Sequence, residues 1–240
     1  MSLKIAVLYL KITRRIEQYP IATPYEIGHQ RFYHKYREFK PVIPHDLIIV
    51  RCGATEGATD FDAIATHYLR FDGWGSDCAA YQAVVRILDY DLVLCLNTLA
   101  YPWRHHWLEP FVAALEKHGK GVYGASASYE ITPHLRTPAI AFHPDVLREY
   151  PFEVTNRGDS VVFESSLNSI SSWCHRTGYP TILVTADGRY YRDDWRKPAN
   201  IFRRGDQSNV LLWDRHTDIF ANAGPDEKAS LAKAADTRTC

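Results

Sequence analysis

The chain has 240 residues, of which 46% are hydrophobic and 13% aromatic, which is enough for one large domain with an extensive core. This composition excludes an intrinsically disordered chain. Twenty-eight basic residues balance 28 acidic ones, so no bulk electrostatic field recruits nucleic acid or an anionic membrane surface.

The first 125 residues alternate between predicted strands and predicted helices. Three apolar runs without polar alternation predict strands covered on both faces, and one further strand is expected between the second and third of these runs. These strands are expected over residues 4–10, 46–50, 67–71 and 92–96. Thr23-Pro24 predicts the start of one helix, Ser76 caps a second, and Leu108 begins the apolar spacing of a third. Strand–helix alternation of this kind favours an α/β fold.

The second half is less regular. Short strands are predicted over 122–124, 139–142 and 181–185. Apolar residues from Phe163 to Cys174 recur at helical spacing and predict one helix that ends at Gly178. From residue 222 the chain is rich in alanine and charge, and we expect a flexible tail over 222–240.

Cysteine usage and hydropathy bear on the compartment. The five cysteines are scattered and form no Cys-x-x-Cys pair, which indicates a reducing compartment and no structural zinc site. No apolar run approaches the roughly 18–20 residues that span a bilayer, so no transmembrane segment is predicted. We therefore expect a cytoplasmic protein, which could still act beside a membrane on a lipid-linked substrate.

Several enzyme classes are disfavoured because their motifs are missing from the sequence. No Gly-x-Gly-x-x-Gly follows the first predicted strand, and no Gly-Lys-Ser/Thr phosphate loop is present. Neither His-Glu-x-x-His nor Gly-x-Ser-x-Gly occurs, which argues against a zinc hydrolase and an α/β-hydrolase.

The strand over 92–96 ends abruptly in the polar pair Asn97-Thr98. Open α/β sheets hold ligands at the carboxyl ends of their strands, so this pair marks the expected centre of function. Gly53 follows another buried strand, where a glycine permits close approach of a ligand. Asp77 lies in the first turn of a predicted helix, where the helix dipole alone would also favour a carboxylate.

Four short stretches carry a resemblance to a known family. They are Val50-Arg51-Cys52-Gly53-Ala54-Thr55-Glu56-Gly57, Asp72-Gly73-Trp74-Gly75-Ser76-Asp77-Cys78-Ala79-Ala80-Tyr81, Asn97-Thr98-Leu99 and Trp107-Leu108. In their order and spacing they resemble glycosyltransferases of the A-type (GT-A) fold, most closely the family-2 type. The resemblance extends over residues 3 to 220. Asn97-Thr98-Leu99 stands where that family places its metal-binding Asp-x-Asp motif.

The resemblance implies a single-domain, nucleotide-sugar-transferase (GT-A-like) α/β fold, with a mixed central sheet flanked by helices. The domain would span residues 1–221, with a nucleotide-binding half over 1–125 and an acceptor half over 126–221. The implied function, of the kind used in polysaccharide biosynthesis, is transfer of a sugar from a nucleotide-sugar donor to a glycan or lipid-linked acceptor. The family-2 likeness implies inversion at the sugar carbon.

The resemblance and the residue chemistry together nominate site residues. The donor-binding candidates are Arg51, Gly53, Asp77, Asn97, Thr98 and Arg104. Glu164 is the first candidate for general base and Asp159 the second. His216 matches a late histidine that such enzymes bring to a metal, and manganese or magnesium is the cofactor the family implies. The neutral Asn97 and Thr98 argue against tight metal binding, in which case basic side chains would meet the charge of the leaving group. Those basic candidates are Arg104, His105, Arg203 and Arg204.

Two other functions fit the same sequence. One is a non-catalytic nucleotide-sugar or glycan-binding module on the same fold. The other is a nucleotidyltransferase, which would need a basic glycine-rich loop after the first strand. The stretch from Lys11 to Arg15 is basic but has no glycine, so this reading ranks last.

Overall fold

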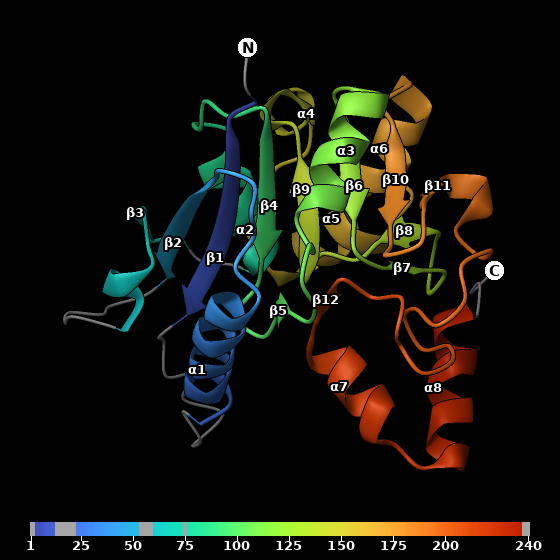
Figure 1. Ribbon diagram of the computed structural model, residues 1–240. Coiled ribbons are helices and arrows are strands. Elements are labelled where there is room, and N and C mark those ends of the chain that lie inside the picture. The colour runs from blue at the N-terminus through green and yellow to red at the C-terminus, as the bar shows by residue number, and fades with distance from the viewer. Residues whose placement is uncertain (1–2, 13–22, 53–59, 74–75, 237–240) are drawn as a thin grey trace.

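A mixed β-sheet forms the centre of the computed structural model, which describes residues 3–12, 23–52, 60–73 and 76–236 (Figure 1). Within those residues the sheet has eight strands in the order β11-β10-β6-β9-β4-β1-β2-β3. The strands are β1 (Ile5–Ile12), β2 (Asp46–Cys52), β3 (His67–Phe71), β4 (Leu92–Leu96), β6 (Val122–Gly124), β9 (Ala139–Phe142), β10 (Thr181–Val184) and β11 (Arg189–Tyr191). The predicted α/β class with a mixed central sheet is confirmed.

Six of the eight strands run in one direction, and β9 and β11 run against them. β1 pairs in parallel with both β2 and β4, and β2 pairs in parallel with β3. β9 runs antiparallel to both β4 and β6, and β10 continues parallel to β6. The six strands that share a direction (β1, β2, β3, β4, β6 and β10) therefore have their carboxyl ends at one edge of the sheet. This is the lower edge in Figure 1, where α1 and α7 lie.

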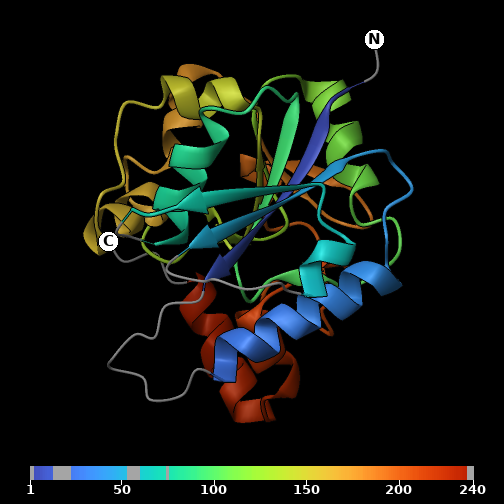
Figure 2. The same cartoon turned by 90° about the vertical axis from the view of Figure 1, so that its left-hand side faces the viewer.

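Helices cover both faces of the sheet. They are α1 (Thr23–Glu38), α2 (Asp77–Val85), α3 (Glu109–His118), α4 (Pro144–Glu149), α5 (Arg157–Ser165), α6 (Ile170–Thr177), α7 (Arg215–Asn222) and α8 (Pro225–Asp236). Short 3-10 helices span Asp60–Ala63 and Arg192–Asp194. Figure 2 shows α3 on one side of the sheet and α2, α4, α5 and α6 on the other.

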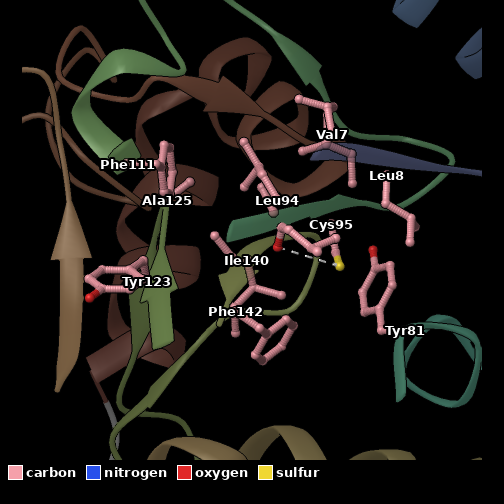
Figure 3. Close-up of a cluster of buried hydrophobic side chains, with 14 of the residues drawn as sticks. Val7, Leu8, Tyr81, Leu94, Cys95, Phe111, Tyr123, Ala125, Ile140 and Phe142 are labelled. Atoms are coloured by element: carbon pink, nitrogen blue, oxygen red, sulfur yellow. Dashed lines mark hydrogen bonds between the residues drawn. The ribbon is translucent and has the colours of Figure 1, made fainter. Parts of the chain in front are cut away.

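The core lies where these helices meet the central strands. All five residues of β4 are fully buried, which explains why its sequence is apolar without alternation. In Figure 3, Tyr81 of α2 lies beside Leu8 and Cys95, while Phe111 of α3 lies beside Ala125. The two helices thus fill opposite sides of the same sheet.

The predicted helix from Phe163 to Cys174 is wrong, because it consists of two helices. α5 ends at Ser165 and α6 begins at Ile170, with the Ser169 side chain accepting a hydrogen bond from the Ser172 amide as N-cap. The Thr132 hydroxyl donates to the last carbonyls of α5, and Leu167 is 74% exposed in the break. The apolar spacing therefore continued across a turn that local serines and Thr132 stabilise.

The segment predicted as a flexible tail contains a helix. Residues 225–236 form α8, whose Ala235 carbonyl accepts a 2.9 Å hydrogen bond from the Tyr129 amide. Alanine is the strongest helix former, so the composition that suggested a tail also supports a helix once it has a surface to pack on. None of the helices in the described residues is long and apolar enough to cross a membrane.

Two ribbons of two-residue strands complete the described structure. β5 (Tyr101–Pro102) pairs with β12 (Leu212–Trp213), and β7 (Ala127–Ser128) pairs with β8 (His134–Leu135). The β5–β12 ribbon brings α7 next to the carboxyl edge of the sheet, because α7 begins directly after β12.

Candidate functional site

Asn97 leaves the carboxyl end of β4 and is held there by its backbone and its side chain. Its amide N–H donates to the Pro138 carbonyl at 3.0 Å, and its Oδ1 accepts from the Leu99 amide at 3.1 Å. The Asn97 side chain also lies close enough to the Asp77 carboxyl to lower the pKa of that group. Asn97 and Asp77 therefore lie together at the strand end, where α/β sheets hold ligands.

Asp77 is the first residue of α2, and Ser76 is the N-cap of that helix. The pKa of the Asp77 carboxyl is raised to about 6, chiefly by burial and to a smaller extent by the nearby Glu164 carboxylate, whereas Asn97 lowers it. The pKa of Asp77 thus lies close to physiological pH, as is common for groups in functional sites.

Glu164 comes from α5 and points its carboxylate at the same place. Its Oε1 accepts hydrogen bonds from the amide and the hydroxyl of Thr137, at 3.1 and 3.0 Å. No partner of Oε2 is found among the described residues. A hydrogen bond between the hydroxyls of Ser76 and Ser160 joins α2 to α5 and fixes the two carboxylates relative to each other.

Asp77, Asn97 and Glu164, called the carboxylate site from here on, thus come together from α2, the end of β4 and α5. All three residues were predicted from the sequence, whereas Thr137, which holds Glu164, was not. Thr137 is a threonine between two short strands, and no local pattern distinguishes it from any other loop threonine.

A basic cluster includes Arg136, the residue directly before Thr137. Arg136 and Asp214 form a buried ion pair at 2.6 Å, with side chains only 8% and 7% exposed. Nearby, Nη2 of Arg203 lies 3.3 Å from Nδ1 of His216. Burial, followed by the charge of Arg136, lowers the pKa of both Arg203 and His216. Arg136, Arg203 and His216 are called the basic cluster below.

Arg203 is buried with one hydrogen-bond donor unused. Its Nη1 donates to the Leu231 carbonyl of α8, whereas its Nε has no partner in the described part of the chain. Phe202 lies between this guanidinium and that of Arg136, at 4.9 and 4.1 Å from the ring centre. Buried donors are nearly always satisfied, so an unpaired one here suits an anionic ligand.

The surroundings of His216 do not fit a divalent cation. Three arginines, Arg136, Arg203 and Arg215, disfavour positive charge on the imidazole, and only Asp214 among the named charges favours it. Within residues 3–12, 23–52, 60–73 and 76–236, no cluster of three or more histidine, cysteine or acidic side chains is placed to hold a metal. The role of His216 as a metal ligand stays a prediction from the family resemblance.

The other nominated residues lie outside the carboxylate site. Thr98 is buried and its hydroxyl donates to the Leu10 carbonyl at 2.8 Å, which ties β4 to β1. Asp159 forms a capping box with Asn156 at the start of α5. Arg104 is exposed and donates to the Ser208 carbonyl at 3.1 Å.

Two further candidates belong to β2 and to the segment that follows it. The Arg51 guanidinium lies 4.2 Å from the centre of the Tyr68 ring. Gly53 falls outside the described residues. Donor binding by either residue stays a prediction.

Comparison with known proteins shows the fold. No protein-family model matches the chain, and no curated protein matches its sequence. A Bacillus anthracis crystal structure assigned as a glucose-1-phosphate thymidylyltransferase, in complex with sucrose, matches with a TM-score of 0.52 and 11% identity. The match covers 98% of this chain and 97% of that one.

Partial matches include S. aureus TarS, with 11% identity, a TM-score of 0.43 and coverage of 63% of this chain and 30% of that one. TarS 1-349 in complex with UDP matches with 12% identity and a TM-score of 0.42, over 61% of this chain and 48% of that one. The chain thus spans less than half the length of these TarS chains. The full-length match to the Bacillus anthracis structure shows that the two chains share a fold.

Proposed function

We propose that this protein is a glycosyltransferase that moves a sugar from a nucleotide-sugar donor to a hydroxyl acceptor, with inversion. The observation that carries the proposal is the carboxylate site, because Asp77, Asn97 and Glu164 converge at the carboxyl edge of the sheet. The fold shared with a structure assigned as a glucose-1-phosphate thymidylyltransferase supports a site for a nucleotide and a sugar.

Glu164 suits the role of general base for the acceptor hydroxyl. Thr137 holds one carboxylate oxygen in place, which leaves the other to accept a proton. Inverting transfer needs such a base on the face of the sugar opposite the leaving group. Asp77 and Asn97 would then bind donor hydroxyls beside it.

The basic cluster suits the leaving diphosphate. Negative charge develops on the diphosphate as the sugar departs, and preorganised hydrogen-bond donors and cations stabilise it. Arg203, with its unpaired Nε, is the best placed donor of the cluster. In this proposal Arg203 and His216 do what the family's Asp-x-Asp motif does through a metal.

Nucleotide binding provides the first test. Thermal shifts are measured with UDP, GDP, CMP and dTDP nucleotides, each with EDTA and with manganese. We expect one nucleotide to raise the melting temperature equally under both conditions. Asn97→Ala should reduce that shift, while the free protein loses only the small stability of the Leu99 hydrogen bond. A shift that appears only with manganese would contradict the metal-free role of the basic cluster.

Turnover then separates an enzyme from a non-catalytic binding module. Glu164→Gln should lower turnover by about 10²–10⁴-fold while donor binding is unchanged, because only proton transfer is lost. Donor hydrolysis or transfer is measured by nucleotide release. Glu153→Gln is the matched control, since its side chain is 74% exposed, and it should leave turnover unchanged. Equal turnover in both variants would remove Glu164 from the mechanism, and nucleotide affinity without any turnover would favour the binding module.

A further inference from the structure

A cavity lies between α1 and α7, and the turn that carries Asn97 forms part of its wall through Leu99. Its volume is about 170 Å³, well above the roughly 10–15 Å³ that one water molecule needs. Ile27 and Leu99 provide its apolar wall, and Arg31, Arg215 and Asp218 provide its charged wall. The turn presents Asn97 to Asp77 and Leu99 to this cavity, so one short segment separates the two places.

Asp218 contributes little free negative charge to the cavity. Its Oδ2 accepts from Arg31 Nη1 and its Oδ1 accepts from the Tyr101 hydroxyl, each at 2.5 Å. The Arg31 guanidinium also lies 5.1 Å from the centre of the Tyr101 ring. Arg31 is therefore held in one orientation, with most of its N–H donors still unused.

Arg215 supplies the excess positive charge. It is exposed, and no hydrogen bond or ion pair connects it to any other residue in the described part of the chain. Two guanidinium groups against one neutralised carboxylate leave the cavity with a net positive wall. The helix amides of α7 do not add to it, because the Thr217 amide donates to the Asp214 cap at 2.8 Å.

We infer that this cavity is an oxyanion subsite that binds a phosphate group. Planar guanidinium groups match the oxygen geometry of phosphate, and a pair of them around a cavity of this size suits one phosphate with an apolar neighbour against Ile27 and Leu99. We assign this phosphate to the acceptor, an assignment that rests on the proposed glycosyl transfer. The reason is that the turn of residues 97–99 contributes Asn97 to the carboxylate site and Leu99 to the cavity.

The test measures phosphate binding at the cavity without any nucleotide sugar. Inorganic phosphate and glycerol 3-phosphate are titrated into ¹⁵N-labelled protein, and the amide shifts of Gly28 and Leu99 are followed. We expect saturable shifts in the wild-type protein and about 10–100-fold weaker binding in Arg215→Gln, which removes the unpaired cation. Arg37→Gln is the matched control. It removes an exposed arginine of α1 that does not line the cavity, so this variant should bind phosphate as the wild type does.

Three outcomes would overturn the inference: shifts that do not saturate, equal binding in Arg215→Gln and wild type, or saturable shifts confined to the amides of Asp77 and Asn97. Failure of the proposed transfer is distinguishable from failure of this inference. If Glu164→Gln has no effect on turnover, the transfer proposal fails, but saturable phosphate binding at the cavity would still support the subsite. A second arm compares glycerol 3-phosphate with short-chain phosphatidic acid. Tighter binding of the lipid would assign the phosphate to a lipid-linked acceptor, and tighter binding of glycerol 3-phosphate to a soluble one.

Discussion

Asp77 illustrates how one residue position couples binding to stability. Its carboxyl lies between the Asn97 amide, which favours the charged form, and the Glu164 carboxylate, which disfavours it. Burial is the largest influence and raises the pKa to about 6. Keeping Asp77 ionised at neutral pH therefore costs the folded protein free energy, which a bound ligand with hydroxyl donors would offset.

Replacing Asp77 with asparagine should stabilise the protein at neutral pH but not at low pH. Between the ordinary pKa of 3.8 and the folded pKa of about 6, the folded state keeps a proton that the unfolded chain has released. The contribution of Asp77 to the free energy of unfolding therefore falls as pH rises through this window, by up to about 3 kcal/mol.

Urea unfolding of the wild type and Asp77→Asn, at pH 4, 5, 6 and 7.5, measures this difference. We expect it to grow with pH and then level off above pH 7. Asp72→Asn serves as control, because Asp72 lies just before α2 and its carboxylate is exposed beside Arg70. A difference that is the same at every pH would refute the shifted pKa.

At the level of single residues, the sequence located the carboxylates better than their supports. Asn97 and Asp77 stand at the end of a buried strand and the start of a helix, positions that sequence patterns reveal. Thr137 is 27 residues away from Glu164 in the chain, and Arg136 is 78 residues away from Asp214. Such pairs form only when the fold is complete, so periodicity along the chain contains no information about them.

Among the elements, α1 stands out for how closely it approaches the turn after β4. A methyl group added at Gly28 would lie 2.7 Å from the Thr98 carbonyl oxygen and 2.9 Å from the Leu99 side chain. Glycine is therefore required by close packing and not by backbone conformation. The turn that carries Asn97 on one side is supported by α1 on the other.

Gly28→Ala should displace α1 from this turn. Overpacking against backbone costs about 1–3 kcal/mol, which exceeds the gain of about 1 kcal/mol from the better helix propensity of alanine. We expect a lower melting temperature together with weaker nucleotide binding. Gly224→Ala is the matched control, since a methyl group there meets nothing within 4 Å. An equal or higher melting temperature for Gly28→Ala would show that the turn adjusts freely.

Element prediction succeeded for the apolar strands of three or more residues, including 122–124 and 139–142, and missed the two-residue strands. Residues 47–50 and 92–96 are buried, and these stretches are apolar without alternation because both faces of their strands are covered. The two-residue strands β5, β7, β8 and β12 have too few residues for any periodicity. The break between α5 and α6 was hidden because apolar residues kept helical spacing across it.

At the scale of the whole molecule, the Arg136–Asp214 ion pair joins the sheet region to α7. Asp214 also caps α7 through the amide and the hydroxyl of Thr217, at 2.8 and 2.9 Å. Arg136 lies directly beside Thr137, which holds Glu164. The buried pair thus links the basic cluster, the carboxylate site and the C-terminal helices in one network.

Asp214→Asn should be strongly destabilising, because it leaves the buried Arg136 guanidinium without its counter-charge. Breaking one side of a buried ion pair costs about 3–5 kcal/mol, whereas asparagine still caps the helix well. Chemical denaturation gives the free energy of unfolding. Asp89→Asn removes the exposed partner of Lys4 and should leave the denaturation midpoint unchanged. Similar denaturation midpoints for Asp214→Asn and Asp89→Asn would contradict this, because they would mean that water solvates the Arg136 guanidinium in place of its counter-charge.

β9 is the strand that holds the two ends of the sheet together. It is the strand that joins β4, and the parallel strands beyond it, to β6 and β10. Until residue 142 has been synthesised, one edge of the wholly apolar β4 has no partner strand, and unpaired edges of that kind template aggregation. We therefore expect the nascent chain to depend on chaperones until β9 emerges from the ribosome, and fragments that end before it to be insoluble.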